Sequence, residues 1–114
     1  MIGFPHVLYD MIREIDMSKL IALYKLPPDP AAFDKAYFNT HLPLIKKVPG
    51  LQTARIIRFT RTLMGEGFYM MAEMTFNDQE ALKAGMKSPV MAAAGENLNT
   101  FASRLATLMY AEDV

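Results

Sequence analysis

The fold is decided by residues 51–76, LQTARIIRFTRTLMGEGFYMMAEMTF, where two apolar-rich runs surround a short loop with two glycines. Residues 51–60 and 68–76 contain many β-branched, aromatic and methionine side chains, which is typical of strands. The loop at 63–67 contains Gly65 and Gly67, and glycines suit the turn of a hairpin. We therefore predict two antiparallel strands that pair symmetrically about Met64.

This symmetric pairing fixes a register for the predicted hairpin, because side chains alternate between the two faces of a strand. One of the pairs brings opposite charges together, and we expect it to form a weak cross-strand ion pair. The predicted opposite pairs are Arg55 with Glu73, Ile57 with Met71 and Phe59 with Tyr69.

Both faces of this hairpin are apolar, whereas a lone antiparallel sheet normally keeps one polar face. Two helices can cover one face, but the other carries too much apolar area to remain in water. We therefore predict a homodimer through the sheet face, with loops or residues 1–16 as the alternative cover. The helix-covered face is predicted to hold Ala54, Ile56, Phe68, Met70, Ala72, Met74 and Phe76, and the other face Leu51, Ile57, Phe59, Tyr69 and Met71.

A strand and a helix are predicted before the hairpin. Residues 19–25 form a short apolar run that ends at a proline-rich stretch, and Asp29 followed by Pro30 is a helix start. Phe33, Tyr37, His41 and Ile45 then recur at four-residue spacing, which places them on one helical face. Because proline disfavours the preceding helical residue, we expect a kink or restart at 40–43 and an end at 49–50.

A second helix and a last strand are predicted after the hairpin. Asn77 is expected to cap the helix, with Glu80 three residues later completing a capping box. Ser88 followed by Pro89 indicates a break and a restart, and residues 105–110 form the final strand. The order β-α-β-β-α-β predicts an α+β domain of the ferredoxin-like class with a four-stranded antiparallel sheet.

The predicted domain covers residues 17–114, and residues 1–16 are an extension of uncertain role, in which apolar residues recur at helical spacing. The formal net charge is zero, so the sequence gives no reason to expect a nucleic acid or a membrane as partner. No apolar run approaches the roughly 18 residues that a transmembrane helix needs. Cysteine is absent, which excludes disulfides and thiolate chemistry and fits a cytoplasmic location.

Several stretches of this chain resemble the EthD family, named for ethyl tert-butyl ether degradation, which belongs to the dimeric α/β-barrel group. The resemblance covers about residues 19–111 and includes the aromatic-rich helix, the step from His41 to Pro43 and the following exit from the helix. The stretches that carry it are KLIALY (19–24), DPAAFD (29–34), YFNTHLPL (37–44), VPGL (48–51), AEMTF (72–76), DQE (78–80) and the helix restart near Ser88.

This resemblance implies that two sheets pack into a dimeric α/β barrel, with a cavity between sheet and helices in each chain. Members of the barrel group include cofactor-free monooxygenases, isomerases, cyclases and dehydratases, so the fold does not identify a reaction. We expect a protein without a cofactor that binds a small apolar oxygenated compound, either as an oxidoreductase or as an accessory protein of oxidative degradation. A non-catalytic carrier of a hydrophobic metabolite is the alternative.

His41 is the predicted catalytic residue, carried over from the histidine in the family's helix. A histidine exchanges protons near neutral pH, as a general base needs. The competing interpretation is structural, with the ring bonded to backbone carbonyls that Pro43 leaves free.

The predicted binding residues are aromatic and methionine side chains around this histidine. Tyrosines can offer a hydroxyl to a ligand oxygen, and methionines adapt to irregular pockets. Ordinary core packing is the competing interpretation of each. The predicted set is Tyr24, Phe33, Tyr37, Phe38, Met70, Met74 and Met86.

Other kinds of site are not supported by the sequence. A metal site is not expected, because His6 and His41 are the two histidines and no paired ligand motif occurs. The glycines at 65 and 67 form no phosphate-binding loop. Residues 67–74, GFYMMAEM, weakly resemble the third strand of RNA-recognition domains, but the basic residue and the spaced aromatics of that motif are missing.

Overall fold

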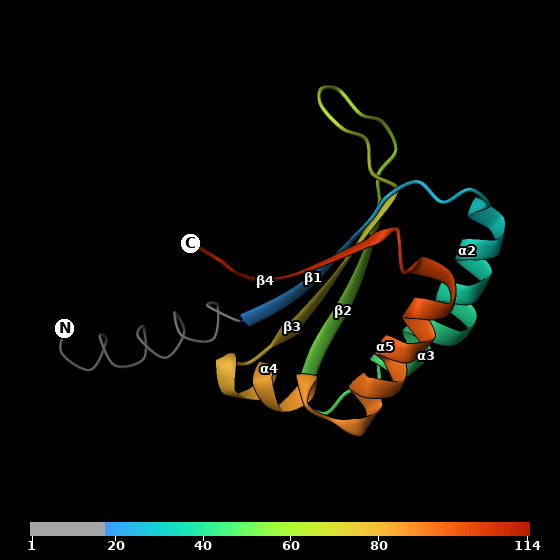
Figure 1. Ribbon diagram of the computed structural model, residues 1–114. Helices are drawn as coiled ribbons and strands as arrows, with labels where there is room; N and C mark the ends of the chain where they lie inside the picture. Colours follow the sequence, from blue (N-terminus) through green and yellow to red (C-terminus); the bar gives the residue numbers. More distant parts are fainter. Residues whose placement is uncertain (1–17) are drawn as a thin grey trace.

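The computed structural model describes residues 18–114, and the predicted extension at 1–16 lies outside the described residues. The chain forms one four-stranded antiparallel sheet in the order β2-β3-β1-β4, with helices on one face (Figure 1). This is the predicted ferredoxin-like α+β fold. The elements are β1 (Ser18–Tyr24), α2 (Pro30–Ala36), the π-helical turn η1 (Tyr37–His41), α3 (Leu42–Ile45), β2 (Leu51–Arg58), β3 (Met70–Phe76), α4 (Gln79–Met86), α5 (Pro89–Ala102) and β4 (Ala106–Glu112).

The register of the central hairpin is as predicted. Arg55 lies opposite Glu73 and Ile57 opposite Met71, and the Phe59 N–H donates to the Tyr69 carbonyl at 3.1 Å. The ion pair expected from this register is wrong, however. The Glu73 carboxylate lies 3.5 Å from the Lys19 ammonium of the neighbouring strand β1 instead.

Tyr69 does not lie on the uncovered face as predicted. It precedes the first residue of β3, its ring packs edge to face on Phe33, and its hydroxyl donates to the Asp34 carboxylate at 2.9 Å. Phe33 and Asp34 belong to α2, so Tyr69 lies on the helix side of the sheet. Strict alternation fails here because Tyr69 stands outside the regular ladder.

Helix capping explains where two of the helices begin. Asp29 accepts the Ala32 N–H at 3.1 Å, as the sequence predicts for α2. The predicted cap of α4, Asn77, is wrong by one residue, because Asp78 accepts the Ala81 N–H at 2.8 Å. Asp and Asn are equally good caps, so local chemistry alone did not separate the two neighbours.

The restart predicted at 40–43 is present, but as a π turn followed by α3 and without a break in the helical backbone. Leu42 is helical, with φ −59° and ψ −42°, and its N–H donates to the Tyr37 carbonyl five residues earlier. A π turn is wider than an α turn by one residue. It leaves room for the proline ring, which lacks an N–H and clashes in a regular α-helix. The chain therefore stays helical through His41 and into α3.

The core lies between the sheet and the helices. Alternate residues of β1 and β3 point to this side and are buried, which follows from the period of a strand. Side chains of α2, α4 and α5 cover them. The buried core includes Leu20, Ala22, Tyr24, Phe33, Tyr37, Ile45, Met70, Ala72, Met74, Phe76, Leu82, Ala94, Leu98 and Ala102.

The opposite side of the sheet has no helix over it in residues 18–114, and we call it the open face (Figure 1). Its central side chains are apolar and half-buried by their neighbours in the sheet. Two of its charged side chains are paired, since Lys19 lies 3.5 Å from Glu73 and also 2.8 Å from Asp113, while Arg55 on the same face is exposed. The apolar residues of the open face are Ile21, Leu23, Ile57, Met71 and Met109.

We predict that Gly85→Ala destabilises the protein by about 1–3 kcal/mol, the usual cost of overpacking a core. A Cβ at Gly85 would lie 2.8 Å from Phe76 Cε2 and 3.1 Å from the Pro49 carbonyl oxygen. Phe76 is fully buried and cannot move aside, so the clash exceeds the gain of up to about 1 kcal/mol in helix propensity.

The matched control is Gly95→Ala in α5, where an added Cβ meets nothing within 4 Å. This variant should gain roughly 0.5–1 kcal/mol from the smaller conformational entropy of the unfolded chain. Urea unfolding of both variants provides the measurement. Equal changes in the free energy of unfolding of the two variants, in the same direction, would show that a Cβ at Gly85 does not clash with Phe76.

Candidate functional site

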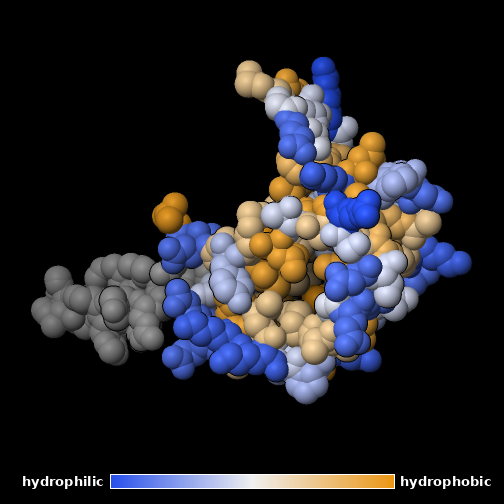
Figure 2. Space-filling model, in the orientation of Figure 1, coloured by the Kyte–Doolittle hydropathy of each residue, from blue (hydrophilic) through white to orange (hydrophobic). Residues whose placement is uncertain are grey.

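A cavity of about 170 Å³ lies between the helix side of the sheet and the helices. Figure 2 shows a hollow at this place, bordered by hydrophobic surface. The cavity extends to the edge strand β4, where Leu108 is 51% exposed. It is lined by Leu20, Ala22, Tyr24, Tyr37, His41, Ile45, Met74, Met86, Met91, Ala94, Gly95, Leu98 and Leu108. None of these side chains carries a permanent charge.

His41 is a polar side chain of this lining, and it is 97% buried, with 3% of its surface exposed. Its Nδ1 lies 3.1 Å from the amide oxygen of Asn97 in α5. The imidazole ring packs near Tyr37 and Phe101, with ring centroids at 5.3 and 5.9 Å. His41 is the last residue of the π turn, directly before α3 and two residues before Pro43. The ring is therefore held by contacts on several sides.

The hydrogen bond to Asn97 selects one tautomer of His41. An amide oxygen only accepts, so Nδ1 carries the proton and donates it, and Nε2 keeps a lone pair. Burial lowers the pKa of His41 below its usual value of 6.5, although the hydrogen bond to Asn97 opposes this shift. No hydrogen bond to Nε2 is found within residues 18–114. The neutral ring thus offers a proton acceptor at the cavity.

Two tyrosines complete the polar part of the lining. Their rings pack edge to face, with centroids 5.6 Å apart, and each is 1% exposed. Burial raises the pKa of Tyr37 to about 12, and the neighbouring Tyr24 hydroxyl partly opposes that rise. Burial also raises the pKa of Tyr24, with a further rise from Tyr37. Both hydroxyls keep their protons at neutral pH and can donate a hydrogen bond.

The structure brings five of the predicted site residues to this cavity and separates three from it. Phe33 packs behind the lining, between Tyr24, Tyr37 and Phe101. Met70 is fully buried in the core, and Phe38 is 39% exposed on the outer side of the helix. The five that line the cavity are Tyr24, Tyr37, His41, Met74 and Met86.

The structure also adds residues that the sequence reasoning missed, and Asn97 is the most informative. Asn97 lies beside the buried stripe of α5 that contains Ala94, Leu98 and Ala102. A polar amide three residues after Ala94 and directly before Leu98, beside an apolar stripe, was a readable signal of a buried hydrogen bond. What the sequence did not reveal is the partner, because His41 is 56 residues away.

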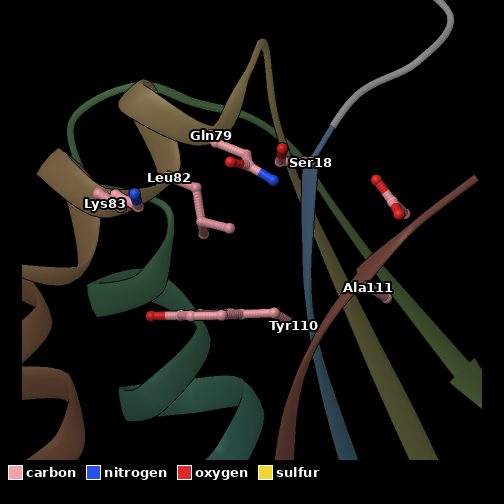
Figure 3. Close-up of a pocket in the computed structure, with 7 residues that line it drawn as sticks. Ser18, Gln79, Leu82, Lys83, Tyr110 and Ala111 are labelled. Carbon is pink, nitrogen blue, oxygen red and sulfur yellow. The ribbon is translucent and has the colours of Figure 1, made fainter.

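A second hollow of about 290 Å³ lies between α4 and the end of β4 (Figure 3). Figure 3 shows Gln79, Leu82 and Lys83 on one side, with the Tyr110 ring crossing from β4 below Leu82. Tyr110 is 64% exposed, so a molecule held here would stay largely in water. The cavity beside His41 is therefore the better candidate site, because its polar groups are few, buried and convergent.

Two further findings concern the described part of the chain. Within residues 18–114, no three histidine, cysteine or acidic side chains lie close enough together to hold a metal ion. Over the same residues, no helix is both long enough and apolar enough to cross a membrane.

A family model and a solved structure both identify the EthD family. The model of the EthD domain matches residues 25–104. The crystal structure of an EthD family protein from Bacillus halodurans is 45% identical, with a TM-score of 0.82, over 86% of this chain and 99% of that one. An uncharacterised 11.0 kDa protein of the thcB-thcC intergenic region of Rhodococcus erythropolis is 27% identical, over 85% of this chain and 95% of its own.

A more distant structure shares the fold. It is a dimeric protein of unknown function with a ferredoxin-like fold from Bacteroides fragilis, 19% identical with a TM-score of 0.61. The match covers 85% of this chain and 96% of that chain.

We predict that the free energy of unfolding falls as the pH is lowered from 7 to 5, in part because of His41. Its pKa is lower in the folded state than in the unfolded one, so the unfolded chain binds the extra proton first. This contribution is complete above about pH 6.5 and is lost as the pH falls through the folded pKa. The slope for one proton is at most about 1.4 kcal/mol per pH unit.

The matched variant is His41→Gln, which keeps a polar side chain but does not titrate. Urea unfolding at pH 5, 6 and 7 should show a shallower pH dependence for the variant than for the natural chain. Every other ionisable group is the same in both proteins, so the contribution of these groups cancels in the comparison. Parallel pH profiles would contradict the assignment of a neutral, buried His41.

Proposed function

The chain belongs to the EthD family, and from its cavity we propose that it binds one small, neutral, largely apolar molecule beside His41 and exchanges a proton with it. The observation that supports this most is the geometry of His41. Its Nδ1 is committed to Asn97, and its ring lines an otherwise apolar cavity. A histidine that served only to satisfy backbone carbonyls would not need this arrangement.

The size and charge of the cavity define the class of ligand. An engineered cavity of about 150 Å³ in another protein accommodates benzene, so about 170 Å³ suits a molecule of about one ring. The lining has no lysine, arginine or carboxylate, and an ion would lose its hydration without compensation. A neutral molecule with one oxygen function fits these limits.

The proposed chemistry is proton abstraction by His41. Neutral Nε2 takes a proton from an O–H group, or from a C–H group next to a carbonyl, and the ring becomes an imidazolium ion. The Asn97 oxygen, which accepts from Nδ1–H, stabilises that cation. The protonated hydroxyl of Tyr37, with the Tyr24 hydroxyl beside it, is suited to donate to the negative oxygen that forms on the ligand.

A carrier without turnover is the alternative function, because the same cavity would hold a ligand that never reacts. An oxidative role is a further part of the proposal, since the family resemblance also implies monooxygenase-like members. Consumption of dissolved oxygen by the protein in the presence of a phenol would show that an oxidation follows the proton transfer. Each of these roles uses His41 differently, so one set of variants can separate them.

We also propose that two copies associate through their open faces. Ile21, Leu23, Ile57 and Met71 form an apolar surface there, and the neighbouring Lys19 is already paired with Glu73 and Asp113 within the chain. Covering these four side chains removes apolar area from water, which favours association. The distant relative from Bacteroides fragilis, described as dimeric, supports the proposal.

We predict that phenol binds to the protein more tightly than toluene and that His41→Leu removes this preference. The leucine keeps the bulk and the apolar character but cannot accept a hydrogen bond. Loss of a buried hydrogen bond should weaken phenol binding about tenfold, while toluene binding changes less than twofold. Isothermal titration calorimetry measures both affinities.

The control is Phe38→Ala, which removes an exposed ring from the same helical segment outside the cavity. It should leave both affinities unchanged. Equal effects of the two substitutions, or no binding of either probe at millimolar concentration, would contradict the proposed site.

Turnover is tested with a one-ring ketone, acetophenone, in D₂O. If His41 abstracts a proton next to the carbonyl, the methyl protons should exchange for deuterium faster with protein than without it. The exchange should be lost in His41→Leu and kept in Phe38→Ala, as followed by NMR. Binding of the ketone without any exchange would favour the carrier.

A further inference from the structure

A hairpin arm stands out from the body of this small domain. It comprises residues 59–69, between β2 and β3, and it rises beyond the end of the sheet and bends away from α2 and α5 (Figure 1). Figure 2 shows hydrophobic surface at its end. Leu63 is 86% exposed and Met64 is 91% exposed. Two neighbouring large apolar side chains at the tip of an arm are typical of a contact surface.

The root of this arm is fixed to the body by a polar cluster. The Asp34 carboxylate accepts two hydrogen bonds from the Arg58 guanidinium, both at 3.2 Å, and one from the Tyr69 hydroxyl at 2.9 Å. The guanidinium also lies 4.3 Å from the centre of the Tyr69 ring. Arg58 directly precedes the arm and Tyr69 is its last residue, so both ends of the arm are held and its direction is set before any partner binds.

The apolar surface of the arm continues the open face. Alternation along β2 places Ile57 on the open face, and Phe59, the first residue of the arm and 40% exposed, follows at the next position of the same parity. Both limbs of the arm border a further hollow that contains Phe59, Leu63, Met64 and Phe68. A molecule that covers the open face is therefore next to the arm.

The area of the open face alone is small for a stable dimer. The four strands cover a flat area of roughly 470 Å², from their length and the usual strand spacing. A standard interface buries about 800 Å² on each partner. Additional contact is needed beyond the sheet, and the arm is the adjoining apolar feature that can supply it.

We propose that residues 59–69 form a dimerisation arm, which packs Leu63 and Met64 against the body of a second copy of this chain. The inference rests on the proposed association of open faces. Two-fold symmetry gives each copy one arm and one receiving surface, so the contact is made twice. The alternative occupant is a lipid surface, but the arm carries one basic and one acidic residue, Arg61 and Glu66, and so lacks the net positive charge that attracts anionic lipids.

The test is the dimer dissociation constant of the full chain, measured by sedimentation equilibrium. In the double variant Leu63→Asp with Met64→Asp, it should rise at least tenfold, because two apolar contacts are lost in each arm. The control Thr60→Asp adds charge to the arm but keeps its tip, and it should leave the constant within threefold. The circular dichroism spectrum should not change in the double variant, since both side chains are exposed and the fold is kept.

The possible outcomes separate the arm from the open-face dimer. The natural chain could dimerise, lose dimerisation in Ile57→Lys and keep it in the arm variant. That result would contradict the role of the arm and would still support the face-to-face dimer. A natural chain that stays monomeric at 100 µM would overturn both. The natural chain could also co-sediment with phosphatidylcholine vesicles. If the arm variant lost this binding but dimerised as before, the tip of the arm would bind a lipid surface instead.

Discussion

Four strands with apolar side chains on both faces are the constraint on which this structure depends. A chain of 114 residues forms few helices that could cover such a sheet. All the helices in the described region lie on one side of it. On that side they build the core and leave a cavity toward β4. On the other side, Ile21, Leu23, Ile57 and Met71 remain without a cover of their own. The candidate site and the proposed interface thus have the same origin.

The π turn links this architecture to the site. Pro43 cannot follow a regular α-helix without loss of a hydrogen bond and a steric clash, and the wider turn at Tyr37–His41 resolves both. The same turn keeps Tyr37 and His41 on the inner side, with ring centroids 5.3 Å apart. Such turns occur often at functional sites. Pro43, on the outer side of the helix, is therefore linked through the π turn to the positions of Tyr37 and His41 in the cavity.

Much of the fold could be predicted because it rests on local and periodic signals. The hairpin register followed from symmetry about the loop, and the shared face of Tyr37 and His41 followed from four-residue spacing. The failures have tertiary causes. Tyr69 turned toward Asp34, which only the packed helix places there. Met74 lines the cavity, whereas Phe33 and Met70 lie behind it. No local sequence signal distinguished these residues, because the difference depends on where α5 packs against the sheet.

The identity of the partner of His41 limits the chemistry that this site can perform. A carboxylate at this position would stabilise the imidazolium strongly and make the ring a better base. Asn97 offers a neutral oxygen instead, so the hydrogen bond orients the ring but compensates little of the cost of charging it inside an apolar cavity. His41 is therefore a weak base that is active at neutral pH and suited to protons that are already acidic. A phenolic hydroxyl, or a carbon next to a carbonyl, meets this requirement far better than an ether or an alkane.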